Sequence, residues 1–224
     1  MTRKIDAVAN TPTDEPTWKQ RAVERSTRAA KLRAEQRVQR FLDAAQAIIT
    51  EKGSTDFTVQ EVVDRSRQSL RSFYQHFDGK HELLLALFED ALRRATEQMA
   101  AAAAGHADPL DRLKAAVQLL FELSQPDPPA RRPLFTDFAP QLLLTHSAEV
   151  RRAHVPLLAL LGELMTEAEA AGALRPGLTA RRAAALTMQT VMIVAQSAAV
   201  SAGELPVVTA DDVWEFCAKG FAGS

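Results

Sequence analysis

Two short segments of helical periodicity follow one another closely, at residues 58–66 and 69–76, and this pair constrains the fold more than any other feature of the sequence. Thr58 and Glu61 have the spacing of a capping box, in which each side chain bonds the backbone N–H of the other residue. Ser69 is a residue type that caps helix N-termini well. The two segments therefore predict two short helices joined by a tight turn.

The helix expected before this pair supplies the surface on which the pair packs. Apolar residues recur at steps of three and four from Val38 to Ile49, and Gly53 ends the pattern as a C-terminal glycine does. The side chains that can close a small core are Phe41, Ile48, Val62, Phe77 and either Leu70 or Phe73. Such a unit is a helix-turn-helix, and the major groove of duplex DNA admits one α-helix.

The rest of the sequence also predicts helices, so the expected fold class is all-α. The helices are expected at 80–104, 109–124, near 134–144, 147–171, 179–202 and 209–221. The 147–171 helix should bend or restart at Pro156, and 125–133 should be a loop because its prolines lack the N–H that a helix requires. We predict a helix-turn-helix domain over 35–80 and a larger helical domain over 81–224.

The N-terminal residues 1–34 are expected to form a disordered, basic extension. Residues 1–16 have no apolar periodicity, whereas residues 17–40 carry eight Lys and Arg against two Glu. Such a stretch is either a solvated extension of the first helix or an arm that lies along phosphates or enters the minor groove. We expect phosphate contact, so deleting residues 1–34 should weaken binding to all DNA sequences alike.

The composition disfavours several other classes of protein. Cys217 is the only cysteine, so an internal disulfide or a zinc–thiolate cluster is excluded, and the chain suits a reducing cytoplasm. The five histidines lack the carboxylate or nucleophile spacing that catalysis needs, so we expect no enzyme, no metal and no cofactor. Polar residues interrupt the longest apolar stretch, 183–200, which favours a buried helix over a membrane span, and residues 1–16 lack the apolar core of a signal peptide.

Two runs in this region resemble a known family. The run FYQHFDGKHEL, residues 73–83, closely resembles the recognition-helix signature of the tetracycline-repressor (TetR) family, and FTVQEVVDRS, residues 57–66, is similar to that family's second helix. The resemblance covers about residues 36–88. It departs from the family at Arg67 and Gln68, where the family usually has Gly and then Val. A non-glycine residue in a left-handed turn costs about 1 kcal/mol, and Arg67 is also placed to reach a phosphate.

The resemblance implies roles for individual side chains. Tyr74 and Lys80 should bind phosphates, Lys80 from a helix N-terminus where the dipole favours anions, and Thr58 should cap the second helix. Arg71 is the best candidate for a bidentate guanine contact. The full set expected at the DNA is Thr58, Arg67, Ser69, Arg71, Ser72, Tyr74, Gln75, His76 and Lys80.

In the TetR family the C-terminal helices form a ligand pocket, and the last two form a four-helix bundle with a partner chain. We therefore expect a homodimer through about 179–202 and 209–221, with Ala195, Ala198 and Ala199 permitting close approach. The pocket residues expected here are Phe121, Phe135, Phe138, Leu142, Met165, Met188, Gln189 and Met192, with Gln118 and His146 as further polar contacts. The alternative for each apolar residue is ordinary core packing.

These expectations combine into one hypothesis of function. The chain should be a dimeric repressor that a small, lipophilic ligand releases from a palindromic operator in double-stranded DNA, because few charged residues occur among the expected pocket positions. The alternative is an activator, or an architectural DNA-binding protein that takes no ligand, since either would have the same helix-turn-helix domain.

Overall fold

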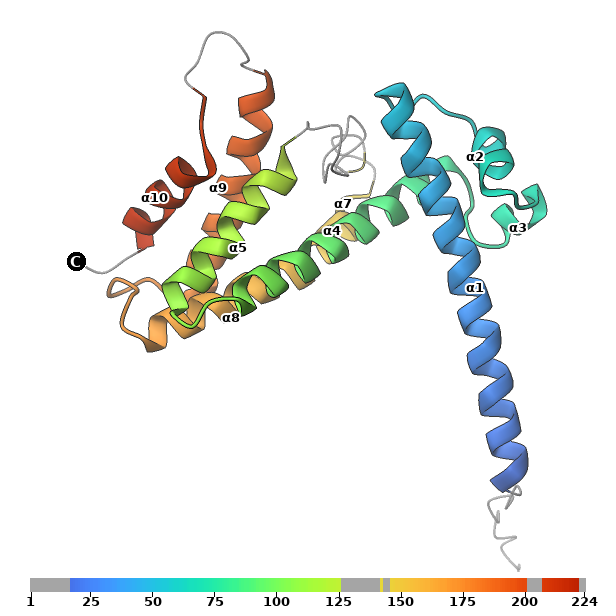
Figure 1. The fold of residues 1–224 in the computed structure, drawn as a ribbon, viewed down its shortest axis with the longest axis horizontal. Helices are drawn as coiled ribbons and strands as arrows, with labels where there is room; N and C mark the ends of the chain where they lie inside the picture. Colours follow the sequence, from blue (N-terminus) through green and yellow to red (C-terminus); the bar gives the residue numbers. More distant parts are fainter. Residues whose placement is uncertain (1–16, 126–141, 143–145, 201–206, 222–224) are drawn as a thin grey trace, which may run out of the picture. The chain divides into compact units, whose positions relative to one another are not determined.

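The computed structural model describes residues 17–125, 142, 146–200 and 207–221, with the backbone alone for 198–200. Every regular element in this part of the chain is a helix, as the sequence predicts (Figure 1). The chain divides into two compact units, Met1–Arg40 and Phe41–Ser224. Helix α1 (Thr17–Lys52) begins in the first unit and ends in the second.

Two short helices and one long helix follow α1. They are α2 (Val59–Ser66), α3 (Leu70–Tyr74) and α4 (Lys80–Ala104). These bounds confirm the expected helices at 58–66 and 80–104, whereas the helix expected at 69–76 ends earlier, at Tyr74. Residues 17–34, expected to be a disordered extension, lie within α1, because their Ala, Arg, Lys, Gln and Glu residues are good helix formers. The domain boundary expected after residue 80 stays a prediction.

The C-terminal helices are α5 (Pro109–Ser124), α7 (Ser147–Ala153), α8 (Val155–Ala170), α9 (Ala180–Val200) and α10 (Ala210–Phe221). The restart expected near Pro156 is confirmed: α7 ends before His154, and Pro156 lies in the first turn of α8, where a missing N–H breaks no bond. The loop expected at 125–133 and the helix expected near 134–144 fall outside the described residues, apart from Gln125 and Leu142.

Side-chain caps fix where these helices begin. Asp108 accepts hydrogen bonds from the N–H groups of Leu110 and Asp111 at 2.8 and 3.1 Å. Thr209 and Asp212 form a reciprocal cap at the start of α10, and the hydrogen bonds that the Thr209 hydroxyl and N–H donate to the Asp212 carboxylate lower the pKa of that carboxyl. Each cap satisfies N–H groups that the helix itself leaves unbonded.

Helix α4 links the helix-turn-helix formed by α2 and α3, here called the head, to the rest of the second unit. It packs against α5, α7 and α8, while α9 packs against α5 and α8, and α10 against α5 and α9 (Figure 1). Its buried side chains recur at steps of three and four: Leu83, Leu84, Leu87, Phe88, Leu92, Ala95, Met99 and Ala103. One apolar stripe therefore anchors α4 along its length. No helix in the described ranges is both long enough and apolar enough to cross a membrane.

Candidate nucleic-acid interface

A reciprocal cap starts α2 and also ties this helix to α1. The Glu61 N–H donates to Thr58 Oγ1 at 3.2 Å, and the Thr58 N–H donates to Glu61 Oε2 at 2.7 Å, so the expected capping box is confirmed. Lys52 Nζ on α1 lies 2.6 Å from Glu61 Oε1. Arg65 pairs with Glu51 in the same way and lowers the pKa of that carboxyl. Helix α2 is thus held to the end of α1 by two ion pairs.

The hydrogen bond from Lys52, together with those from Thr58, lowers the pKa of Glu61 from 4.5 to about 2. A lowered carboxyl pKa adds stability above the unfolded-state pKa, and this contribution is lost as the pH falls through the folded-state pKa. We therefore expect the free-energy difference between wild type and Glu61→Gln to shrink as the pH falls from about 4.5 to about 2. Urea unfolding of both proteins across this range measures it, and a pH-independent difference would contradict the assignment.

The turn between α2 and α3 contains one residue in the left-handed conformation. It stands where the family that the sequence resembles usually has glycine. Arg67 has φ 54° and ψ 38°, and it is the one non-glycine residue with positive φ in the described part of the chain. Its N–H donates to the Asp64 carbonyl at 3.3 Å, and the Gln68 N–H donates to the Val63 carbonyl at 3.3 Å. The turn thus keeps the bonds that close a helix C-terminus, although it lacks the usual glycine.

Replacing Arg67 by glycine should therefore stabilise the protein. Relief of left-handed strain gives about 1–2 kcal/mol, and the greater freedom of glycine in the unfolded chain removes about 0.4–1 kcal/mol, so we expect a net gain of roughly 0.5–1 kcal/mol. Thermal or urea unfolding measures this gain. Arg67→Ala is the matched control, because it removes the guanidinium and keeps the strain. A control as stable as Arg67→Gly would refute the strain argument.

Helix α3 turns one aromatic side chain inward and several polar ones outward. Phe73 is fully buried, and its ring lies edge-on to that of Phe41, with centroids 5.4 Å apart. Phe77 completes a three-ring cluster at 6.1 Å from Phe41 and 5.3 Å from Phe73. Of the two residues proposed for this core position, the structure therefore selects Phe73, and Leu70 is 42% exposed.

The expected DNA-contact residues other than Lys80 divide into two groups. The exposed ones are Thr58, Arg67, Ser69, Arg71, Tyr74 and Gln75. Ser69 also caps α3, accepting a hydrogen bond from the Ser72 N–H at 3.1 Å. Ser72 and His76 are half-buried instead, and their Oγ and Nε2 atoms are closed off from solvent with no hydrogen-bond partner. These side-chain atoms are therefore not available at the surface, which weakens the expectation that Ser72 and His76 contact bases.

Lys80 begins α4, and its ammonium has a defined position. Its Nζ atom lies 4.7 Å from the centroid of the buried Phe57 ring, a cation–π contact that holds the charge beside the first turn of α4. Lys80 also lines a cavity of about 380 Å³ together with Asp78, Gly79, His81, Glu82, Leu85 and His146. His146, expected as a contact in the ligand pocket, lies here at the start of α4 instead. A partly exposed lysine at a helix N-terminus suits a phosphate.

The residues expected to line a ligand pocket lie in several different environments. Phe121, Leu142 and Met165 are completely buried, Met188 is buried, Met192 is half-buried, and Gln189 is exposed. Phe135 and Phe138 lie outside the described residues. Gln118 donates a hydrogen bond from Nε2 to Asp211 Oδ1 at 2.7 Å, joining α5 to α10.

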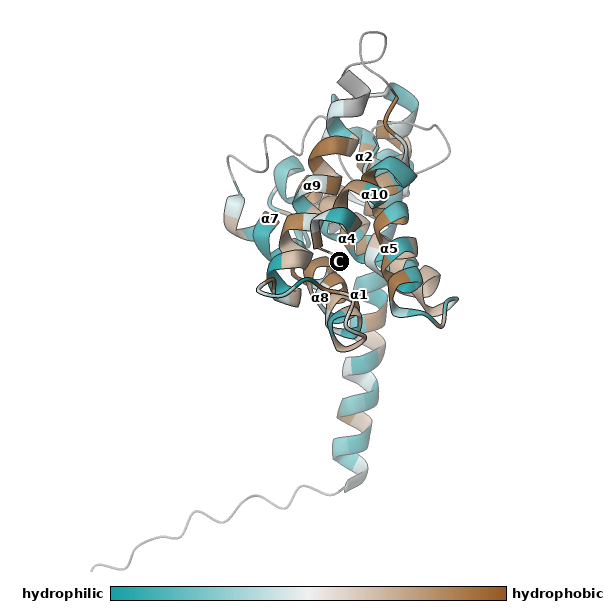
Figure 2. Cartoon of the chain, turned by 90° about the vertical axis from the view of Figure 1, so that its left-hand side faces the viewer, coloured by the Kyte–Doolittle hydropathy of each residue, from teal (hydrophilic) through white to brown (hydrophobic). Residues whose placement is uncertain are grey.

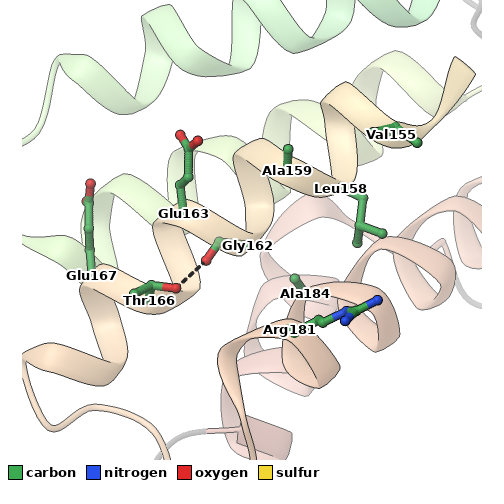
Figure 3. A pocket seen from close by; sticks show the side chains of 9 residues that line it. All are labelled: Val155, Leu158, Ala159, Gly162, Glu163, Thr166, Glu167, Arg181 and Ala184. Carbon is green, nitrogen blue, oxygen red and sulfur yellow. Dashed lines mark hydrogen bonds between the residues drawn. The ribbon is translucent and has the colours of Figure 1, made fainter. Parts of the chain in front are cut away.

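A larger cavity, of about 720 Å³, lies between α8 and α9 and is lined by other residues (Figure 3). Helix α8 supplies most of its wall and α9 supplies two residues; the lining is Val155, Leu158, Ala159, Gly162, Glu163, Thr166, Glu167, Arg181 and Ala184. Glu167 also pairs with Arg112 of α5 at 2.7 Å. None of the expected pocket residues lines this cavity, so that set stays a prediction.

Within the described ranges, no group of three or more His, Cys, Asp or Glu side chains is arranged to hold a metal ion. Cys217 of α10 is buried, and burial raises the pKa of its thiol to about 11. A thiol with so high a pKa is almost entirely protonated near neutral pH and is a poor nucleophile.

Comparisons with known proteins agree with this geometry. Residues 41–87 match the family model for bacterial regulatory proteins of the tetR family. The fold is similar to the fatty acid degradation regulator FadR from Bacillus halodurans, with a TM-score of 0.64 and 21% identity over 80% of this chain and 93% of that one. FadR from Bacillus subtilis, solved in complex with stearoyl-CoA, gives 0.63 and 20% over 81% and 98%.

A third solved structure is SmeT, the repressor of the Stenotrophomonas maltophilia multidrug efflux pump SmeDEF. It matches with a TM-score of 0.61 and 20% identity over 84% of this chain and 91% of that one. A comparison with curated protein sequences gives no match. The matched family region, 41–87, contains α2, α3 and the start of α4. The comparison therefore covers the two capped helices and the exposed polar side chains of α3.

Proposed function

We propose that this chain is a dimeric repressor whose α3 helices enter successive major grooves of a palindromic operator, a proposal supported by the match of residues 41–87 to the family model for bacterial regulatory proteins of the tetR family. The observation that carries the proposal is the division of α3 into two sides. Phe73 fixes the helix to the core, while Arg71 and Tyr74 face outward. A helix held in this way presents its donors without having to order them on binding.

Contacts with the DNA follow from where these donors lie. Arg71 matches the hydrogen-bonding pattern of guanine, and the exposed Gln75 matches that of adenine. Tyr74, which is 55% exposed, and Lys80 at the start of α4 are the proposed phosphate contacts. Phosphate contacts fix the register of the head on the duplex, while base contacts supply the sequence preference.

The two C-terminal helices α9 and α10 carry the surface proposed for the partner subunit. Leu186 and Ile193 of α9 are 59% and 62% exposed, and Phe216 of α10 is 70% exposed. Large apolar side chains grouped on adjacent helices are typical of a buried interface. Ala195, expected to allow close approach of the partner, is buried within its own chain, and the side chains of Ala198 and Ala199 lie outside the described residues.

The effector is proposed to be a lipophilic small molecule bound among α5, α8 and α9. Phe121 of α5, Met165 of α8 and Met188 of α9 are buried on three helices that pack against one another, and flexible methionine side chains repack readily around an apolar guest. Helix α4 runs from Lys80 to the contacts with α5 and α8, so a ligand that shifts these contacts would also shift the head. In the proposed role the protein binds this ligand without catalysing a reaction, and it acts in the cytoplasm.

The test compares Arg71→Ala with wild type on a fragment of the gene's own promoter and on a random duplex of equal length. Loss of a bidentate guanine contact should reduce affinity for the promoter by about 1–3 kcal/mol for each protomer, roughly 5- to 150-fold per half-site, with little change on the random duplex. Arg151→Ala, which removes an exposed arginine of α7, is the matched control. Equal affinity of wild type for both duplexes would instead favour an architectural protein, and reporter expression distinguishes a repressor from an activator.

A further inference from the structure

The N-terminal segment of α1, residues 17–40, is a basic helix, here called the basic segment. It carries eight cationic side chains and two acidic ones, Glu24 and Glu35. Every residue from Thr17 to Arg33 is exposed, and Figure 2 shows mostly hydrophilic residues along this stretch, with isolated hydrophobic ones between them. A net charge of +6 on one exposed helix (8 − 2) makes a polyanion the natural partner.

The arginines of the basic segment form two regular rows. Arg21, Arg25 and Arg28 have i, i+4, i+7 spacing and so share one face of the helix, and Arg33, Arg37 and Arg40 repeat the same spacing twelve residues later. At 3.6 residues per turn, the second row is rotated by about a third of a turn from the first and lies roughly 18 Å further along the axis. Two such rows can reach phosphates on both strands that border a groove.

Helical structure decides between the two kinds of DNA contact expected for this stretch. An α-helix with its side chains is about 10–12 Å wide, whereas the minor groove of B-DNA is about 6 Å wide. The basic segment therefore cannot enter the minor groove as an extended arm would. Its 24 residues span about 36 Å, close to one turn of duplex, so it can lie against a whole turn of phosphates.

The apolar side chains of the basic segment argue against a membrane surface as the partner. Trp18, Val23 and Leu32 are all exposed, but their spacings of five and nine residues put them at different angles around the helix. A helix that lies on a lipid bilayer needs one continuous apolar face. Charge without such a face is typical of binding to nucleic-acid phosphates.

We infer that the basic segment is a second DNA-binding surface, which contacts phosphates of duplex DNA without regard to base sequence. This inference rests on the proposed function, and it adds affinity and salt dependence to the sequence preference that α3 supplies. Each phosphate neutralised should contribute about −0.9 to the slope of log K against log salt. Three arginines should therefore contribute nearly −3 in each protomer.

The test uses the full-length protein with the triple variant Arg21→Ala/Arg25→Ala/Arg28→Ala. Affinities for the promoter fragment and a random duplex are measured by fluorescence anisotropy between 50 and 200 mM salt. We expect the slope to become less negative by nearly 3 per protomer on both duplexes. Each protomer's share of the affinity lost between 50 and 200 mM salt is then about 40-fold smaller. The charge-keeping variant Arg21→Lys/Arg25→Lys/Arg28→Lys should retain the wild-type slope, and circular dichroism confirms that each variant is folded.

The outcomes separate this inference from the proposed function. A wild type that binds its promoter, together with an alanine variant of unchanged slope, would overturn the inference alone. So would a loss confined to the promoter fragment, or tighter binding of wild type to single-stranded RNA than to duplex DNA. A wild type that binds neither duplex at any of these salt concentrations would overturn the proposed function itself.

Discussion

Replacing Leu186 and Ile193 together by glutamate is expected to convert the proposed dimer into monomers. Both side chains are exposed in the single chain, and on a two-fold interface the double variant would bury four unpaired carboxylates. Each buried unpaired charge costs several kcal/mol, so the dissociation constant of the dimer should rise by at least about 1,000-fold. Sedimentation velocity over a range of protein concentrations measures this change.

Loss of the dimer should remove operator binding as well. A monomer contacts one half-site only, so its affinity for the promoter should fall toward that for random DNA, a difference of about 10³-fold or more. Val155→Glu is the matched control, because Val155 of α8 is equally exposed and lies off the proposed interface. A double variant that stays dimeric while the control dissociates would place the interface on α8 instead.

Truncation of Phe73 to alanine should unfold the head. Phe73 is fully buried between Phe41 and Phe77, and large-to-small replacement of a buried phenylalanine typically costs 3–5 kcal/mol. Helix α3 has only five residues, so it cannot persist without this contact. We expect binding to every duplex to disappear, and amide hydrogen exchange to speed up in α2 and α3.

Leu70→Ala supplies the control for this truncation, because Leu70 lies on the same short helix but is 42% exposed. Its replacement should cost well under the value for Phe73, about 1 kcal/mol or less. If the two variants are equally stable, the ring cluster does not hold the head together. If the head unfolds in both variants, the stability of α3 depends on its partly exposed side chains as well as on Phe73.

Local sequence patterns predict the helix starts well, because caps depend on residues three apart. Thr58 with Glu61 and Thr209 with Asp212 each form the expected reciprocal bonds. The left-handed conformation of Arg67 is instead implied by the resemblance to the family, which usually has glycine at this position. These features need no knowledge of distant residues.

Side-chain direction within the head is harder to predict. Periodicity leaves Leu70 and Phe73 as equal candidates for the core, and only the position of Phe41 on α1 makes Phe73 the inward one. Ser72 and His76 carry suitable donors, yet both are half-buried. Burial depends on neighbours from other helices, which spacing along one helix does not reveal.

The effector region is the least predictable part of the chain. Phe121, Met165 and Met188 fit a pocket and a packed core equally well, because both environments select large apolar side chains. The cavity between α8 and α9 could not be predicted, because its wall combines small residues such as Ala159, Gly162 and Ala184 with charged ones that otherwise mark a solvent-exposed face. Spaces left by small side chains give no periodic signal in the sequence.

Footprinting on the promoter of the protein's own gene tests most directly whether the 58–80 region is a DNA-reading head carried by a dimer. At modest ionic strength and without added ligand, wild type should protect two short half-sites about one helical turn apart, and Arg71→Ala should lose this protection. Absence of protection, or uniform coverage of the fragment by both proteins, would contradict the account.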